Sequence, residues 1–160
     1  MSFNCRKGGY ILKGEHSFSL FLYLYKIYIM FVPNHLHLLV KGYLLNPPKT
    51  EDTLNNWLSE LVNNVGMKVV AGPTSVYVNE PGNEGITGTV TLATSHASIH
   101  VWDNDKPPMF QFDIYSCKDY DPNIVLNHID QHFDLKEAYW SFIDRNEDTF
   151  FELKNGKWIK

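Results

Sequence analysis

Two segments of this sequence have helical periodicity, and short strand-like runs occupy most of the chain around them. In residues 51–65, apolar side chains recur at helical spacing, acids occupy the first turn, and Gly66 stands where a C-cap belongs. Asp121 followed by Pro122 is typical of a helix start, and that helix should reach about Phe133. Two helices are enough to cover one face of a sheet. The sequence therefore predicts a two-layer α/β sandwich, with a mainly antiparallel sheet covered on one face by two helices.

The strand-like runs are short and are separated by turn residues. In the first of them, His35 and His37 alternate with Leu36 and Leu38, which predicts histidines on one face of the strand and leucines on the other. One or two terminal strands are expected within residues 137–152. The other expected strands are residues 35–43, 67–71, 75–78, 87–93, 98–102 and 109–115.

The first thirty residues do not follow this pattern. Phe18–Val32 is nearly all apolar, but Lys26 interrupts it and Pro33 follows it. The segment is shorter than the ~20 residues that span a bilayer, and no signal-cleavage pattern follows. We therefore expect residues 1–30 to be an extension, with Met30 an alternative start, and expect no membrane partner. A core or interface segment and a membrane element are the alternatives.

Composition limits the class of protein further. We expect one domain over residues 31–153 and a frayed tail at residues 154–160. The net charge of −4 argues against a nucleic-acid partner, because phosphate contacts need a basic face. Cys5 and Cys117 are too few for a disulfide framework or a zinc ribbon, which favours a reducing, cytoplasmic location.

Two histidine pairs have spacings that metal sites also use. His35 and His37 are too few to hold a metal alone, so we interpret them as part of a solvated or partner-facing strand face. His128 and His132 lie four residues apart on the second expected helix, but no carboxylate motif accompanies them. We interpret this second pair as a solvated helix face, and the sequence predicts no metal site.

The densest group of reactive side chains lies in residues 87–117, where a serine, two histidines and a thiol fall on adjacent strand-like segments. The sequence contains no glycine-rich phosphate loop, no H-E-x-x-H motif and no G-x-S-x-G motif. Within the group, Ser95 and His96 interrupt an apolar run, where an unpaired polar group would cost free energy. The pattern alone favours a plain turn at Thr94-Ser95-His96.

Four blocks in this region carry a more specific signal. They are GITG from Gly85, TSHASIHVW from Thr94, DIYSC from Asp113, and Asp121-Pro122. In this order they resemble the motifs of the pyruvoyl-dependent S-adenosylmethionine decarboxylases of prokaryotes, which serve spermidine synthesis. The resemblance covers about a quarter of the chain at motif level. The structural context of the motifs is what would confirm it.

The resemblance assigns roles to five residues. Ser95 matches the serine at which the family's proenzyme cuts itself, so the Thr94–Ser95 bond would be cleaved and Ser95 would become a covalently bound pyruvoyl group, the cofactor. His100 matches the histidine that removes a proton during processing, and Thr87 replaces a serine that assists it. Cys117 matches the cysteine that returns a proton to the product.

The substrate-binding positions match less well. Trp102 matches an aromatic residue that lines the family's nucleoside pocket, but Asp103 and Asn104 replace the proline and glutamate that follow it, so Asp103 or Asp105 is the candidate for the missing carboxylate. Three interpretations stay open: a divergent S-adenosylmethionine decarboxylase, which we favour; a pyruvoyl decarboxylase of arginine or ornithine; and an unprocessed, non-catalytic homologue. The family also implies a homodimer of processed protomers.

Overall fold

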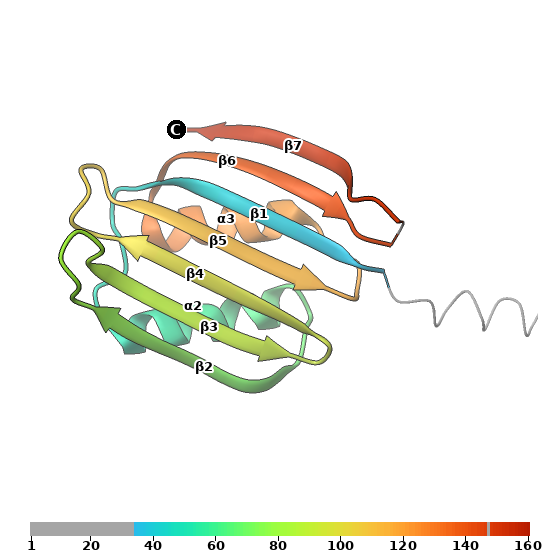
Figure 1. Cartoon of the computed structure of the whole chain (residues 1–160), viewed down its shortest axis with the longest axis horizontal. Helices are drawn as coiled ribbons and strands as arrows, with labels where there is room; N and C mark the ends of the chain where they lie inside the picture. Colours follow the sequence, from blue (N-terminus) through green and yellow to red (C-terminus); the bar gives the residue numbers. More distant parts are fainter. Residues whose placement is uncertain (1–33, 147) are drawn as a thin grey trace, which may run out of the picture. The chain divides into compact units, whose positions relative to one another are not determined.

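The computed structural model describes residues 34–146 and 148–160, and in this part seven strands form a single sheet. The strand order is β2-β3-β4-β5-β1-β6-β7, and neighbouring strands are antiparallel. Both helices lie on one face of the sheet, and no other described element covers the opposite face, which we call the open face (Figure 1). The predicted two-layer α/β sandwich is therefore confirmed. The elements are β1 (Leu36–Leu44), α2 (Glu51–Asn64), β2 (Val69–Val78), β3 (Gly85–Leu92), β4 (Ser95–Trp102), β5 (Met109–Ser116), α3 (Pro122–Phe133), β6 (Leu135–Asp144) and β7 (Phe151–Ile159).

Each helix begins at a side-chain cap, of which the sequence predicted Asp121 but not Thr50. The Thr50 side chain accepts a hydrogen bond from the backbone N–H of Thr53 at the start of α2, and Asp121 caps α3 in the same way through Asn123. Their apolar faces pack on the sheet and are the source of much of the core. Neither helix is long and apolar enough to cross a membrane. The buried helix residues are Leu54, Trp57, Leu58, Leu61 and Val62 of α2 and Pro122, Val125, Leu126, His128, Ile129 and Phe133 of α3.

The first strand lies inside the sheet, between β5 and β6. Leu36 and Leu38 are buried under the helices, whereas His37 is only half-buried and Leu39 is 40% exposed. This alternation between the two faces confirms the prediction for the strand, which begins and ends one residue later than expected.

Strand β2 is continuous where the sequence predicted two short strands. Its pairing with β3 shifts register between Val69 and Ala71 and again between Ala71 and Thr74, an interval that contains Gly72-Pro73. Because β2 is an edge strand, the missing N–H of Pro73 removes no bond from the interior of the sheet.

The frayed tail expected at residues 154–160 is wrong for most of its length, because β7 pairs with β6 along that segment. Gly156 lies against the Trp140 ring, where a Cβ would come within 2.8 Å of the ring carbons. Lys157 forms an ion pair with Glu137, with 2.6 Å between Nζ and Oε1. Most of β7 is exposed on both faces, so it has no apolar alternation that would mark it as a strand.

One predicted surface is also wrong. His128 was expected on a solvated helix face, but it is only 3% exposed and lies between α3 and α2, with its ring stacked on Trp57. The expectations for residues 1–30 and for Cys5 lie outside the described residues.

Candidate active site

The bond before Ser95 lies at the tip of a tight hairpin. Strands β3 and β4 pair without a break from Ile86 opposite Val101 to Leu92 opposite Ser95, so Ala93 and Thr94 alone make the turn. Thr94 has a φ of 64°, in the left-handed region that a β-branched residue rarely adopts. The turn that the pattern favoured is present one residue earlier than expected, and its strained residue directly precedes Ser95.

Cys117 lies beside this turn, just beyond the end of β5. Its backbone N–H donates to Ser95 Oγ at 3.2 Å, and Ser95 Oγ in turn lies 3.7 Å from Cys117 Sγ. The hydroxyl of Thr94 is 2.5 Å from the same sulfur. The structure therefore brings together Thr94, Ser95 and Cys117, as the resemblance implied.

These contacts change the acidity of the thiol. The hydrogen bond with Thr94 lowers the pKa of Cys117 from its usual value, and the hydrogen bonds with Ser95 and with the cysteine's own backbone act in the same direction. Partial burial opposes them without reversing the effect. Cys117 is thus a free, half-buried thiol that gives up its proton more readily than an ordinary cysteine.

Thr87 and His100 form a second pair, on β3 and β4. They lie directly opposite each other in the ladder, with 3.1 Å between Thr87 Oγ1 and His100 Nδ1. The other ring nitrogen of His100 is 3.4 Å from the hydroxyl of Ser98. His100 is five residues from Ser95 along an extended strand, which places it ~16 Å away at ~3.3 Å per residue. Within one chain, the structure does not bring His100 and Thr87 to the Ser95 turn.

The predicted substrate-binding residues lie farther still from Ser95, at the opposite end of β4. Trp102 donates from Nε1 to Asn83 Oδ1 at 2.7 Å. Asp103 accepts a hydrogen bond from the hydroxyl of Tyr77 at 3.0 Å, so its carboxylate is already engaged. Asn104 is exposed in the following turn. A cavity of about 50 Å³ lies beside Trp102, well below the 300 Å³ or more of typical ligand pockets.

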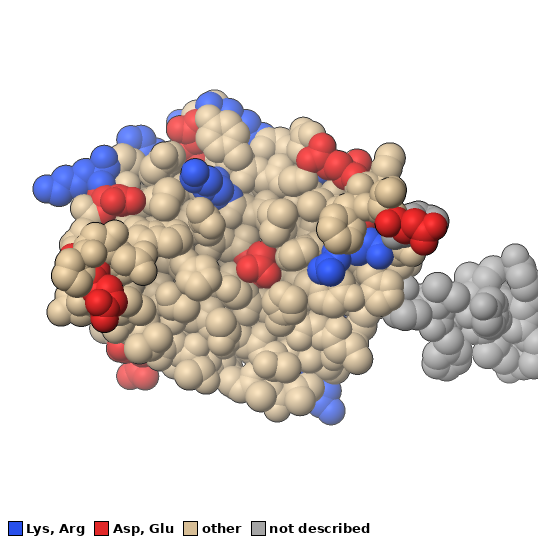
Figure 2. All heavy atoms as spheres, viewed as in Figure 1, with Lys and Arg blue, Asp and Glu red and all other residues tan. Residues whose placement is uncertain are grey.

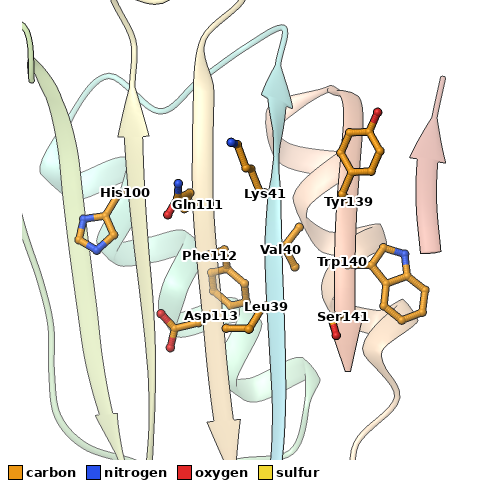
Figure 3. A pocket seen from close by; sticks show the side chains of 10 residues that line it. All are labelled: Leu39, Val40, Lys41, His100, Gln111, Phe112, Asp113, Tyr139, Trp140 and Ser141. Atoms are coloured by element: carbon orange, nitrogen blue, oxygen red, sulfur yellow. The ribbon is translucent and has the colours of Figure 1, made fainter. Parts of the chain in front are cut away.

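A larger hollow lies on the open face of the sheet. It has a volume of about 570 Å³ and crosses β4, β5, β1 and β6, with His100 and Asp113 toward one side and Tyr139 toward the other (Figure 3). This size suits a nucleoside-sized ligand. Neither Ser95 nor Cys117 lines the hollow. The hollow therefore adjoins His100 but not the group at the Ser95 turn.

A third group, which the sequence did not predict, lies on the same face between the hollow and the Ser95 turn. The carboxylate of Asp113 on β5 lies between two imidazoles: Oδ2 is 3.4 Å from His37 Nε2 on β1 and 3.3 Å from His96 Nε2 on β4. The Arg145 guanidinium lies 3.4 Å from the other ring nitrogen of His37 and 4.7 Å above the Tyr115 ring. The strand alternation indicated the face of each residue, but only the register brings them together.

These three side chains are close enough to hold a metal ion, with all their ligand atoms within 4.8 Å of one another. The Arg145 charge beside His37 makes a cation costly there. Arg145 is a hydrogen-bond donor, so His37 Nδ1 also lacks the acceptor that the second nitrogen of a metal-binding histidine usually has. We interpret the group as a carboxylate shared by two histidines. One of these histidines, His96, directly follows Ser95 in the sequence.

Comparison with known proteins adds one finding to this geometry. None of the curated proteins compared with the chain matches it closely enough to count as a relative. A family model described as S-adenosylmethionine decarboxylase matches residues 36–146, from the start of β1 to just beyond the end of β6. This match covers well over half of the chain and includes all the site residues described above. The chain belongs to the S-adenosylmethionine decarboxylase family.

Proposed function

We propose that this chain is a proenzyme that cuts itself between Thr94 and Ser95 and then decarboxylates S-adenosylmethionine for spermidine synthesis. Membership of the family supports decarboxylase activity in general. The observation that carries the specific proposal is the hairpin tip, where a strained Thr94 precedes a serine hydroxyl that contacts a thiol.

The bonds that break in the proposed cut all belong to Thr94 and Ser95. Ser95 Oγ attacks the carbonyl carbon of Thr94, the peptide C–N bond breaks, and the acyl group moves from nitrogen to oxygen as an ester. Loss of the α-proton of residue 95 then breaks its Cβ–O bond, which frees Thr94 as a new carboxylate end. Water replaces the nitrogen at residue 95 with release of ammonia and leaves a pyruvoyl group. The left-handed backbone of Thr94 costs about 1–3 kcal/mol, and the cut releases this strain.

The residues around the turn fit such a group. It would head β4 in the place of Ser95, with the Cys117 sulfur beside it. When present, it supplies a carbonyl that holds the substrate amine and an electron sink for decarboxylation. Cys117 would hold a proton at Sγ for return to the product, and its lowered pKa favours that transfer near neutral pH. A thiol in this role must stay reduced, which fits the cytoplasmic location expected from the cysteine content.

The substrate proposal rests on the open face of the sheet. The hollow of about 570 Å³ is large enough for a nucleoside. Trp102 stays a candidate for stacking on the nucleoside, next to His100. Asp103 is engaged by Tyr77, and Asp113 is engaged by His37 and His96, so Asp105 remains the candidate for the missing carboxylate.

We propose further that two copies are needed for a complete site. His100 on β4 and Thr87 opposite it on β3 lie too far from the hairpin tip to act on Ser95 of their own chain. The open face has its Lys, Arg, Asp and Glu side chains mostly toward the rim, and uncharged surface fills most of its centre (Figure 2). A second copy packed on this face with its β4 in the reverse direction would bring its His100 toward the Ser95 end of the first. A two-fold symmetric homodimer makes two such sites.

Intact mass of the purified full-length chain tests the cut. We expect two fragments, residues 1–94 and 95–160, with the second beginning in a pyruvoyl group. Ser95→Ala should leave a folded chain of 18.5 kDa, whereas Ser59→Ala, a matched change on α2, should be cut normally. If the unaltered, folded protein stays in one piece, it is a non-catalytic homologue and the proposal fails.

Release of labelled CO₂ from the cut protein tests the substrate. We expect release from S-adenosylmethionine and not from arginine or ornithine. Release from either of those amino acids alone would mean that the fold carries a different pyruvoyl decarboxylase.

A further inference from the structure

A second group of polar side chains lies on the far side of the sheet, where α2 meets α3. Glu60 of α2 and His128 and His132 of α3 place their ligand atoms within 4.8 Å of one another. This group is outside the candidate active site, which lies on the hairpin tip and the open face. The two imidazole rings are 4.2 Å apart between centroids.

The two ring nitrogens of His132 have different partners. His132 Nδ1 is 2.9 Å from the backbone carbonyl oxygen of His128. A carbonyl only accepts, so Nδ1 carries the proton and Nε2 keeps its lone pair. That Nε2 lies 3.2 Å from Glu60 Oε2.

A backbone carbonyl also orients the ring of His128. Its Nε2 is 3.2 Å from the carbonyl oxygen of Trp57, so the proton lies on Nε2 and Nδ1 keeps its lone pair, 3.3 Å from the amide nitrogen of Asn64. The His128 ring is also almost fully buried. Histidines that bind metals in proteins nearly always donate their other N–H to a carbonyl or carboxylate, as both do here.

We propose that Glu60, His128 and His132 bind a divalent transition metal, with Zn²⁺ the best fit, and that the metal joins α2 to α3. Two imidazole nitrogens and one carboxylate are a common zinc ligand set, and they suit Mg²⁺ and Ca²⁺ poorly because those ions prefer oxygen. The side chains of Glu60 and His132 are 59% and 38% exposed, so the fourth position faces solvent and water can fill it. Unlike the Asp113 group, this one has no guanidinium or ammonium within ion-pair distance among the described residues.

Zinc binding to the untagged full-length chain tests this inference. After removal of metal with a chelator, titration calorimetry with Zn²⁺ should give one ion per chain. At a hundredfold excess over Kd, the melting temperature should rise by roughly 5–10 °C. Glu60→Gln and His132→Asn change exposed side chains, so both variants should fold, and each should weaken binding tenfold or more.

Two controls separate this site from other ligands in the chain. His96→Asn removes a ligand from the Asp113 group and should leave zinc affinity unchanged. Cobalt(II) in place of zinc should show no thiolate charge-transfer band, which excludes Cys5 and Cys117. The proposal is overturned if Glu60→Gln and His132→Asn bind zinc as the unaltered chain does, if His96→Asn loses binding, if the thiolate band is present, or if no zinc binds.

Discussion

A pair of inactive variants can show whether a site is shared between two chains. Ser95→Ala removes the hydroxyl that attacks the Thr94 carbonyl, and His100→Ala removes the proposed base but keeps the serine. In one chain these residues are ~16 Å apart along β4, whereas proton transfer needs a reach of ~3 Å. If His100 acts on the partner's Ser95, a mixed dimer contains one complete site, formed by Ser95 of the His100→Ala chain and His100 of the Ser95→Ala chain.

The expected yield follows from random pairing. With equal expression of the two variants, about half of the His100→Ala chains lie in mixed dimers, so about half of them should be cut. The Ser95→Ala chains should stay whole. Intact mass tells the two variants apart, and a sizing measurement shows whether dimers form.

The matched control pairs His100→Ala with the double variant Ser95→Ala/His100→Ala, which supplies a partner without a histidine and should give no cutting. Two results would refute the reasoning. One is a His100→Ala chain that is cut fully by itself, and the other is a dimeric mixture in which neither variant is cut.

Three further predictions concern chemistry and stability. Cys117→Ser should be cut normally but decarboxylate at least ~100-fold more slowly, because it lacks an acidic thiol as proton donor; loss of cutting would contradict that role. Gly42→Ala should lower the free energy of unfolding, measured in urea, by about 2 kcal/mol or more. Its new Cβ would overlap Glu137 O and lie 2.9 Å from Ala138 Cα. An unchanged midpoint of urea unfolding would contradict this. Burial lowers the pKa of His128, so the unfolded chain takes up more protons below pH ~6.5, and the melting temperature of the metal-free protein should fall from pH 7 to pH 5. His128→Gln should flatten that dependence, and an equal slope in the variant would show that other groups cause it.

Features that depend on neighbours along the chain could be predicted from the sequence. The Asp121 cap and the apolar spacing of the two segments specify α2 and α3 without reference to the rest of the fold. The contact between Ser95 and Cys117 was implied only by the resemblance, because pattern alone gives no reason for a turn and a strand end to meet.

Features that depend on contacts between distant segments could not be predicted. Burial of His128 results from the packing of α3 against α2. The sequence of α3 alone does not show that a histidine at this position will be buried. The grouping of Asp113 with His37 and His96 depends on the register of three strands. A shift of one residue in either ladder would move the side chains to the opposite face.

The strand order has a consequence for a chain that is cut at Ser95. The first fragment contributes β1, and β1 lies between β5 and β6, both of which belong to the second fragment. Each fragment alone would have unpaired strand edges, so the two products interlock and stay together after the covalent link is gone. An uncut variant refolds as one molecule, but the mature protein must bring two chains together again. Recovery of the cut protein from denaturant should therefore decline as the protein concentration is lowered, because two fragments must associate. Folding of an uncut chain involves one molecule, so its recovery at that step should not depend on concentration.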